Sequence, residues 1–304
     1  MWWSDFGSHT NLPVVMLHAG PGGRSNRLLR EIFASNYWRI IQYDQRACGQ
    51  SVRLPRASDT VEPIGCVRDN STGDLIGDLE LLREHLGIER WAVFGQSWGT
   101  ALAVAYAQRF PDRVLGLMLS AVYLGDSYDI KWFFDGPKAH LPEAYEALIA
   151  PIPVDEREDL LKAYYARIFS PDPAVSIAAA RAFMEYDLWL VFVFPDIQER
   201  AHGLTDLELV TFARIFLHYL ANSFFLGDGV LLGNMHRIDH LPCRIVMGRY
   251  DLAVSLRPAW ELHRSWPGSS MRIVSDGAYS PYQSAMNTAL KEEAILFFKQ
   301  LKSA

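Results

Sequence analysis

The stretch W-A-V-F-G-Q-S-W-G, Trp91–Gly99, decides the fold of this chain. Its apolar first half predicts a buried strand, and the run rich in small residues that follows predicts a helix. Between them lies a G-x-S-x-G pattern, which in this context of strand, turn and helix is typical of a nucleophile elbow. Gly95 and Gly99 leave room for a strained turn that exposes the Ser97 hydroxyl. We therefore expect Ser97 to be a catalytic nucleophile, and the next amide, that of Trp98, to be an oxyanion donor.

Composition excludes several classes of protein. The chain has 304 residues, 50% of them hydrophobic, and a formal net charge of -6 with both signs mixed along its length. It can bury a large core but has no basic patch, so neither a nucleic-acid partner nor a membrane partner is expected. Its cysteines, Cys48, Cys66 and Cys243, form no metal-type spacing and no disulfide framework, which favours a cytoplasmic location. The chain shows no secretory signal and no metal, ATP or dinucleotide motif, so we expect no cofactor and no metal.

Apolar runs alternate with helical patterns towards both ends of the chain. Six runs read as strands buried on both faces, at residues 13–18, 39–43, 91–95, 114–120, 244–248 and 271–275. This alternation predicts an α/β fold with a mostly parallel sheet covered on both faces. The antiparallel strands that usually precede the first parallel strand of such a sheet are not predicted. The middle of the chain is helical in period, aromatic and rich in proline, so we expect a core of residues 1–124 and 228–304 and an inserted helical cap of residues 125–227.

Two further segments follow predicted strands and therefore lie at the same sheet edge as Ser97. His18–Gly23 follows the first of these strands, and the amide of Ala19 or Gly20 is a candidate second oxyanion donor. Asp251 follows a late strand. Serine comes before the acid in the chain, which is the order expected for a fold with this nucleophile elbow, and this makes Asp251 the candidate acid.

Several motifs in register give the chain a likeness to a known family. It resembles the proline iminopeptidases, which are α/β-hydrolase-fold serine peptidases, over nearly everything from Val14 onwards. The family's H-G-G-P-G, D-Q-R-G-C-G-x-S, G-G-S-W-G-S and H-G-R-Y-D motifs correspond to residues 18–22, 44–51, 95–100 and 247–251. We interpret Asp44 and Arg46 in the second motif as structural residues that stabilise their loop by charge-assisted hydrogen bonds. The resemblance implies an α/β-hydrolase fold with a cap.

One departure from the family concerns the catalytic base. The family's triad ends with G-A-G-H-S, whereas this chain reads Gly277-Ala278-Tyr279-Ser280. The resemblance therefore puts Tyr279 at the position of the catalytic histidine and implies a catalytic set of Ser97, Asp251 and Tyr279. A phenol with a pKa of about 10 is a poor base at neutral pH, and loss of one triad member typically costs several orders of magnitude in rate.

A second departure concerns the predicted cap. The family binds the substrate's amino terminus with two glutamates, and the resemblance places Phe216 at one of these positions and Asp187 at the other. We name the aromatic residues near Asp187, which are Phe183, Tyr186 and Trp189, as further candidates for substrate binding. An amine buried with fewer acids is less stable, whereas an apolar ligand gains about 25 cal/mol per Å² of covered surface.

These departures together favour a repurposed enzyme. We hypothesise that it acts on a small, largely apolar molecule by cyclisation, elimination, isomerisation or acyl transfer, with Ser97, Tyr279 and the oxyanion hole, rather than by releasing amino-terminal proline. One alternative is a conventional serine hydrolase or aminopeptidase whose base is His18, a water molecule or the substrate itself. The other is a non-catalytic receptor for a small hydrophobic ligand. In each case the partner is a small molecule, and the protein is a monomer or a homodimer.

Overall fold

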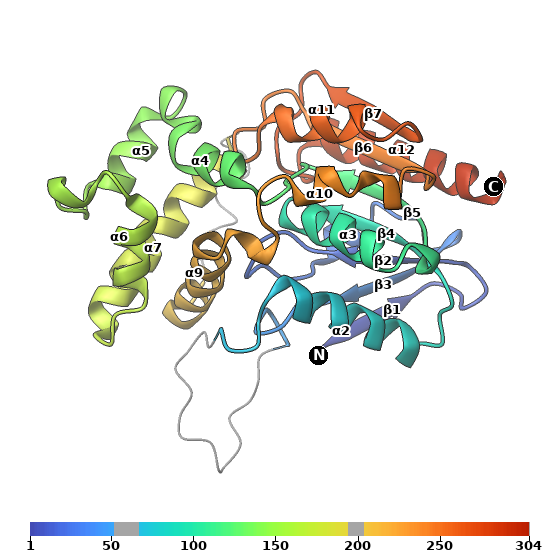
Figure 1. Cartoon of the computed structure of the whole chain (residues 1–304), viewed down its shortest axis with the longest axis horizontal. Helices are drawn as coiled ribbons and strands as arrows, with labels where there is room; N and C mark the ends of the chain where they lie inside the picture. The colour runs from blue at the N-terminus through green and yellow to red at the C-terminus, as the bar shows by residue number, and fades with distance from the viewer. Residues whose placement is uncertain (52–66, 194–203, 304) are drawn as a thin grey trace, which may run out of the picture.

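A seven-stranded sheet forms the centre of the structure, a computed structural model that describes residues 1–51, 67–193 and 204–303 (Figure 1). The strand order is β1-β3-β2-β4-β5-β6-β7. All neighbouring pairs are parallel except β1 and β3. The strands are β1 (Trp3–Phe6), β2 (Leu12–Leu17), β3 (Trp38–Tyr43), β4 (Trp91–Gln96), β5 (Val114–Ser120), β6 (Cys243–Gly248) and β7 (Ser269–Val274). The six predicted strands are therefore confirmed, and the predicted mostly parallel α/β sheet with them.

Helices cover both faces of this sheet. The α-helices are α1 (Arg27–Arg30), α2 (Thr72–His85), α3 (Trp98–Arg109), α4 (Ser127–Asp135), α5 (Pro142–Ile149), α6 (Leu160–Ile168), α7 (Pro173–Val191), α9 (Asp206–Ala221), α10 (Val230–Gly233), α11 (Leu256–Arg264) and α12 (Ser284–Ser303). Short 3-10 helices are η1 (Pro111–Arg113), η2 (Pro137–Ala139), η3 (Val154–Glu156), η5 (Ser223–Phe225) and η6 (Met235–Arg237). Cys66 lies outside the described residues.

Two separate groups of buried side chains show how the sheet is covered. Val14 and Met16 of β2 pack in one group with side chains of α1 and α12, and Val15 and Leu17 pack in the other with side chains of α2 and α3. Successive residues of a strand point to opposite faces, so β2 has a layer of helices on each side. A strand buried in this way contributes roughly 1.5–3 kcal/mol for each fully buried large apolar side chain.

Between β5 and β6 the chain leaves the sheet and forms a separate group of helices. Helices α5, α6, α7 and α9 pack on one another, and in the view of Figure 1 they lie to one side of the sheet. Helix α9 begins with a capping box, in which the Thr205 hydroxyl accepts from the Glu208 amide and the Glu208 carboxylate accepts from the Thr205 amide. The exact limits of a cap at residues 125 and 227 stay a prediction.

Membrane-spanning character is weak in the described residues. None of their helices is, taken singly, both long and apolar enough for a membrane span, and the only pair that qualifies jointly, α9 with Ser223–Gly233, is bent by 74°.

Candidate active site

Ser97 lies at the sharp turn between β4 and α3. Its backbone has φ 52 and ψ -123, a combination that L residues rarely adopt and that stores strain at functional turns. A Cβ on Gly95 would collide with the backbone of Gly99, and one on Gly99 would collide with the carbonyl of Leu17. The strand, turn and helix predicted around Ser97 are therefore present, and two glycines make the close approach possible. Since α3 begins at Trp98, its amide has no carbonyl partner within the helix.

The loop after β2 lies against a cavity in whose wall Ser97 also lies. Ala19 and Gly20 line this cavity together with Ser97. Gly20 has φ +143, and a side chain there would collide with the amides of Gly22 and Gly23. The chain thus turns back tightly beside the elbow, which leaves backbone groups of Ala19 and Gly20 next to the cavity. Their predicted oxyanion role, like that of Trp98, stays a prediction.

His18 is buried in this loop and does not serve as the substitute base considered above. Its Nδ1 lies 2.8 Å from the carbonyl oxygen of Ala19, and its Nε2 accepts from the amide of Gln45 at 3.1 Å. Both ring nitrogens therefore have backbone partners, and His18 is not among the described residues that line the cavity. Burial lowers the pKa of His18, so the ring is neutral. These hydrogen bonds fix the ring within the loop.

Gln45 connects the oxyanion loop with the nucleophile elbow. Its amide side chain donates to the carbonyl of His18 at 3.2 Å and accepts from the indole N–H of Trp98 at 2.9 Å. The side chain of Trp98 is completely buried. A single glutamine therefore fixes the spacing of the two segments that flank the Ser97 hydroxyl.

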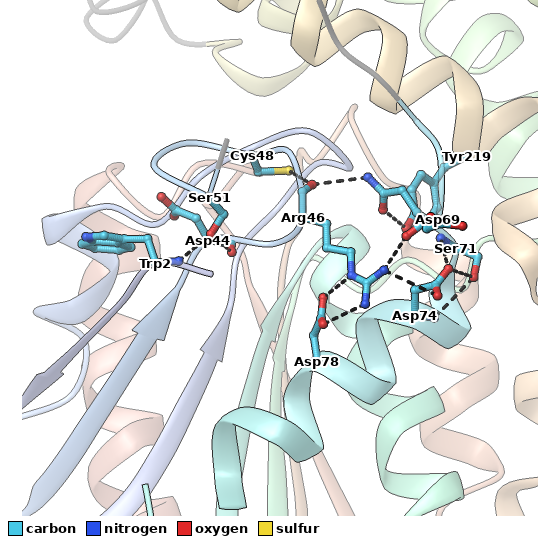
Figure 2. Close-up of polar contacts among 11 residues, drawn as sticks. Trp2, Asp44, Arg46, Cys48, Ser51, Asp69, Ser71, Asp74, Asp78 and Tyr219 are labelled. Atoms are coloured by element: carbon cyan, nitrogen blue, oxygen red, sulfur yellow. Dashed lines mark hydrogen bonds and ion pairs between the residues drawn. The ribbon is translucent and has the colours of Figure 1, made fainter. Parts of the chain in front are cut away.

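The loop after β3 is stabilised by two ionic side chains, as predicted. The carboxylate of Asp44 accepts from the amides of Ser25 and Gln50 at 2.7 and 2.8 Å. The guanidinium of Arg46 donates to both carboxylate oxygens of Asp78 in α2, at 2.5 and 2.9 Å (Figure 2). The structural interpretation of Asp44 and Arg46 is therefore confirmed, because these contacts anchor the loop to the segment that precedes α1 and to α2.

The cavity above Ser97 has a volume of about 200 Å³. Asp187 of α7 and Phe216 of α9 line it, and its walls are mainly apolar. Apolar surroundings raise the pKa of the Asp187 carboxyl to about 7. Ser97, Asp187 and Phe216, far apart in the sequence, are thus brought to one cavity.

The other three candidates for substrate binding lie elsewhere. Phe183 is fully buried against Tyr164 and Phe216. The hydroxyl of Tyr186 donates to the carbonyl of Phe133, and Trp189 is 37% exposed. Phe183, Tyr186 and Trp189 are absent from the described residues of the cavity wall, so the structure does not bring them to the site.

Tyr279 lies in the same cavity wall as Ser97, close enough for the Ser97 side chain to influence its phenol. Burial is the larger effect and raises the pKa of the Tyr279 phenol far above its ordinary value of 10.0. The phenol is therefore neutral throughout the physiological range of pH. Tyr279 lines the same cavity as Ser97 and is buried in the wall of the site.

Asp251 is buried and interacts electrostatically with Tyr279, but it lines a different cavity from that of Ser97, and one of its oxygens is unsatisfied. Its Oδ1 accepts from the amide of Val254 at 2.9 Å. Within the part of the chain that the structure describes, its buried Oδ2 has no hydrogen-bond partner. Burial raises the pKa of Asp251 from 3.8 to about 8, because an ionised carboxylate is costly to place in an apolar environment.

This raised pKa predicts a pH-dependent effect of Asp251→Asn on stability. The folded state favours the protonated acid, so the group's contribution to the free energy of unfolding is complete below about pH 4 and is lost as pH rises through 8. Removing the charge should make the melting temperature of the variant, relative to the wild type, higher at pH 9 than at pH 5, by about 5 °C or more. Thermal melts at both pH values measure this difference. The exposed change Asp155→Asn is the control, and an Asp251→Asn difference that is equal at both pH values would contradict the prediction.

Several cavity residues were missed from the sequence. Arg24, Asn26 and Tyr282 line the cavity with Ser97. The only available signal was the position of Arg24 directly after the glycine-rich loop, and that signal gives no side-chain direction. No group of three or more His, Cys, Asp or Glu side chains among residues 1–51, 67–193 and 204–303 could bind a metal ion.

Comparison with known proteins defines the family. The α/β hydrolase fold family matches residues 13–280. Proline iminopeptidase of Arabidopsis thaliana is 38% identical over 293 residues, covering 95% of this chain and 74% of the plant protein. The probable proline iminopeptidase of Leptolyngbya boryana is 39% identical, over 99% of this chain and 91% of the relative. Proline iminopeptidase of Neisseria gonorrhoeae is 36% identical, over 92% of this chain and 88% of the relative. This chain belongs to the proline iminopeptidase family of α/β hydrolases.

Solved structures support the fold of this family member. The proline iminopeptidase of Mycobacterium smegmatis has a TM-score of 0.56 at 20% identity and covers 99% of this chain and 94% of its own. The Rhodococcus esterase RhEst1 has a TM-score of 0.65 at 18% identity and covers 98% and 94%. At such identities the likeness concerns the fold alone.

Membership of the proline iminopeptidase family corrects the functional hypothesis drawn from the sequence. A repurposed enzyme with non-peptidase chemistry on a small apolar molecule is wrong, because relatives with 36–39% identity over nearly the whole chain are named proline iminopeptidases. Tyr279 and Phe216 are single positions, whereas the likeness to proline iminopeptidases extends over almost the entire chain. This likeness favours the alternative of a conventional serine hydrolase or aminopeptidase.

Proposed function

We propose that this protein is a hydrolase that releases amino-terminal proline from peptides, with Ser97 as its nucleophile. The names of its relatives support this substrate. The observation that carries the proposal is the presence of Asp187 in the same small cavity as Ser97. A carboxyl group in an apolar cavity is an acceptor for a substrate ammonium group, and it lies on the side of the site formed by the helices between β5 and β6.

The proposed chemistry begins with attack of the Ser97 hydroxyl on the carbonyl carbon of the terminal proline. The amides of Trp98 and of Ala19 or Gly20 stabilise the oxyanion that forms. The peptide C–N bond then breaks, the leaving amine takes up a proton, and water hydrolyses the acyl-enzyme to free proline. Asp187 and the apolar wall with Phe216 bind and orient the substrate's first residue. Asp251 and Tyr279 are the other two members of the proposed catalytic set.

The triad in this proposal is incomplete, because Tyr279 stands where an imidazole is needed. Among the described residues of the cavity wall there is no histidine, and the neutral Tyr279 phenol is a hydrogen-bond donor rather than a base. The Ser97 proton therefore leaves to a water molecule, because the substrate's amino group is bound to Asp187 as an ammonium group and cannot accept it. Water is a weaker base in this position than imidazole, so we expect slow hydrolysis, about 10³- to 10⁴-fold faster than the uncatalysed reaction in water.

The test uses a proline-containing peptide with a free amino terminus, its N-acetylated form and a fluorophosphonate probe. We expect free proline to appear, by mass spectrometry, only from the peptide with the free amino terminus. The probe should add one group to the wild-type protein, slowly, and none to Ser97→Ala. Absence of free proline above a blank without protein, or labelling that persists in Ser97→Ala, would contradict the proposal.

A further inference from the structure

The wall of the Ser97 cavity contains one acidic and one basic side chain. Among the described residues that line it, Asp187 and Arg24 are the only members of the Asp, Glu, Lys and Arg classes. The remaining wall is apolar, aromatic or neutral and polar. A molecule that matches this pair has one ammonium group and one carboxylate, separated by no more than the span of a cavity of about 200 Å³.

The backbone that presents Arg24 is fixed on its C-terminal side. The amide of Ser25 donates to the Asp44 carboxylate at 2.7 Å, and the Ser25 hydroxyl donates to the carbonyl of Tyr43 at 2.8 Å. Asn26 is the N-cap of α1, and its side chain also donates to the hydroxyl of Tyr282 at 2.5 Å. Arg24 therefore extends from a rigid point in the cavity wall, which is the condition for a binding residue with a low cost of ordering.

The guanidinium of Arg24 has spare donors. Its Nη1 lies 3.4 Å from Oε1 of Glu208, with the two side chains 61% and 42% exposed. Such an exposed ion pair contributes little. The other oxygen of Glu208 accepts from the amide and the hydroxyl of Thr205, each at 2.9 Å. A guanidinium has five N–H donors, so a second carboxylate can bind Arg24 in a bidentate manner.

We propose that Arg24 binds the free carboxylate of the residue that leaves, so that dipeptides with proline first are the preferred substrates. This inference rests on the proposed function. In a dipeptide the ammonium group and the carboxylate lie on either side of a single peptide bond, and hydrolysis of that bond by one water gives proline and a free amino acid. A longer peptide has its carboxylate farther away, and its second residue offers Arg24 only an amide carbonyl.

The test compares two substrates that differ only in that charge, Pro-Ala and its C-terminal amide Pro-Ala-NH2. We expect kcat/KM to favour the free acid about 10-fold, as is typical of a charge-assisted hydrogen bond. Arg24→Gln should reduce this ratio to about 1. Arg27→Gln, a change of an exposed arginine that pairs with Glu31 outside the cavity wall, should keep the wild-type ratio. A wild-type ratio near 1, or the same ratio in Arg24→Gln, would overturn the proposal.

Glu208 offers a variant with the opposite effect. Glu208→Gln keeps an acceptor for the capping box of α9 and removes the negative charge beside Arg24. We expect the preference for the free acid to increase by about 2- to 3-fold, because the competing carboxylate is gone. A decrease would show that Arg24 does not bind the substrate.

The role of Arg24 is distinguishable from the proposed function itself. Binding of Pro-Ala and Pro-Ala-NH2 to the Ser97→Ala protein, measured by calorimetry, depends on no chemical step. If neither substrate is hydrolysed by the wild type, the proposed function fails. A binding preference for the free acid that is lost in Ser97→Ala/Arg24→Gln would still support Arg24 as the carboxylate site, and equal binding of both compounds would overturn it.

Discussion

Tyr279→His is expected to raise the rate of proline release by about 10³-fold. An imidazole has a pKa near 6.5, so at neutral pH it can take the Ser97 proton and return it to the leaving amine. The buried phenol of Tyr279 cannot do this, because its pKa is raised far above the neutral range. The gain should appear in kcat, since the base acts in the transition state and contributes little to binding.

We expect Asp251 to support such an imidazole. Its Oδ1 is occupied by the Val254 amide, while its buried Oδ2 has no partner among the described residues. A ring N–H at position 279 would satisfy that oxygen and orient the ring, as the acid of a triad does. A nearby imidazolium would also lower the pKa of Asp251 from its raised value, so that the acid ionises when the triad forms.

Kinetics of free proline release measure this gain, with three further variants as controls. Tyr279→Phe keeps the ring and removes the hydroxyl, and it should not gain activity. Tyr279→His/Asp251→Asn should lose most of the gain, and Tyr279→His/Ser97→Ala should lose all of it, because triad members act as a unit. A folded Tyr279→His protein with wild-type kcat would contradict the proposed incomplete triad.

The sheet was predictable from the sequence because most of its parallel strands are largely buried, although the edge strand β7 is only partly so. Runs such as residues 91–94 are apolar throughout, and each is followed by a helix or a loop with a recognisable turn signal. Strand β1, Trp3–Phe6, was not predictable. It contains only four residues, half of them polar, and pairs on one side with β3, so it lacks the continuous apolar pattern of a central strand.

Part of the site was also predictable. The tight turns at Ser97 and Gly20 depend on local residues, and the pattern of glycines in the sequence predicts them directly. The direction of side chains on an aromatic helix does not depend on local residues alone. Phe183 and Asp187 are one turn apart on α7, yet Phe183 packs on neighbouring helices and only Asp187 reaches the cavity. Arg24 was missed for the same reason, because its approach to the cavity depends on how α9 packs against the loop.

Asp187→Asn is the second change with a large expected effect, a decrease of roughly 30- to 100-fold in kcat/KM for proline release. A carboxylate that binds a substrate ammonium group in an apolar cavity contributes about 2–3 kcal/mol, and tenfold corresponds to about 1.4 kcal/mol. The loss should lie mainly in KM, because the contact is present before and during the reaction. Asp187→Glu, which keeps the charge, is the matched variant and should retain more activity than Asp187→Asn.

The pH profile assigns this effect to Asp187. Burial raises its pKa from 3.8 to about 7, so the carboxyl is largely protonated at pH 6 and ionised at pH 8. The wild-type kcat/KM should therefore rise between pH 6 and 8, and Asp187→Asn should lack this rise. The phenols of Tyr123 and Tyr279 in the same wall have raised pKa values and stay neutral over this range. A rise that persists in Asp187→Asn would instead point to Asp251, whose pKa is about 8, and would remove Asp187 from the binding of the substrate's amino group.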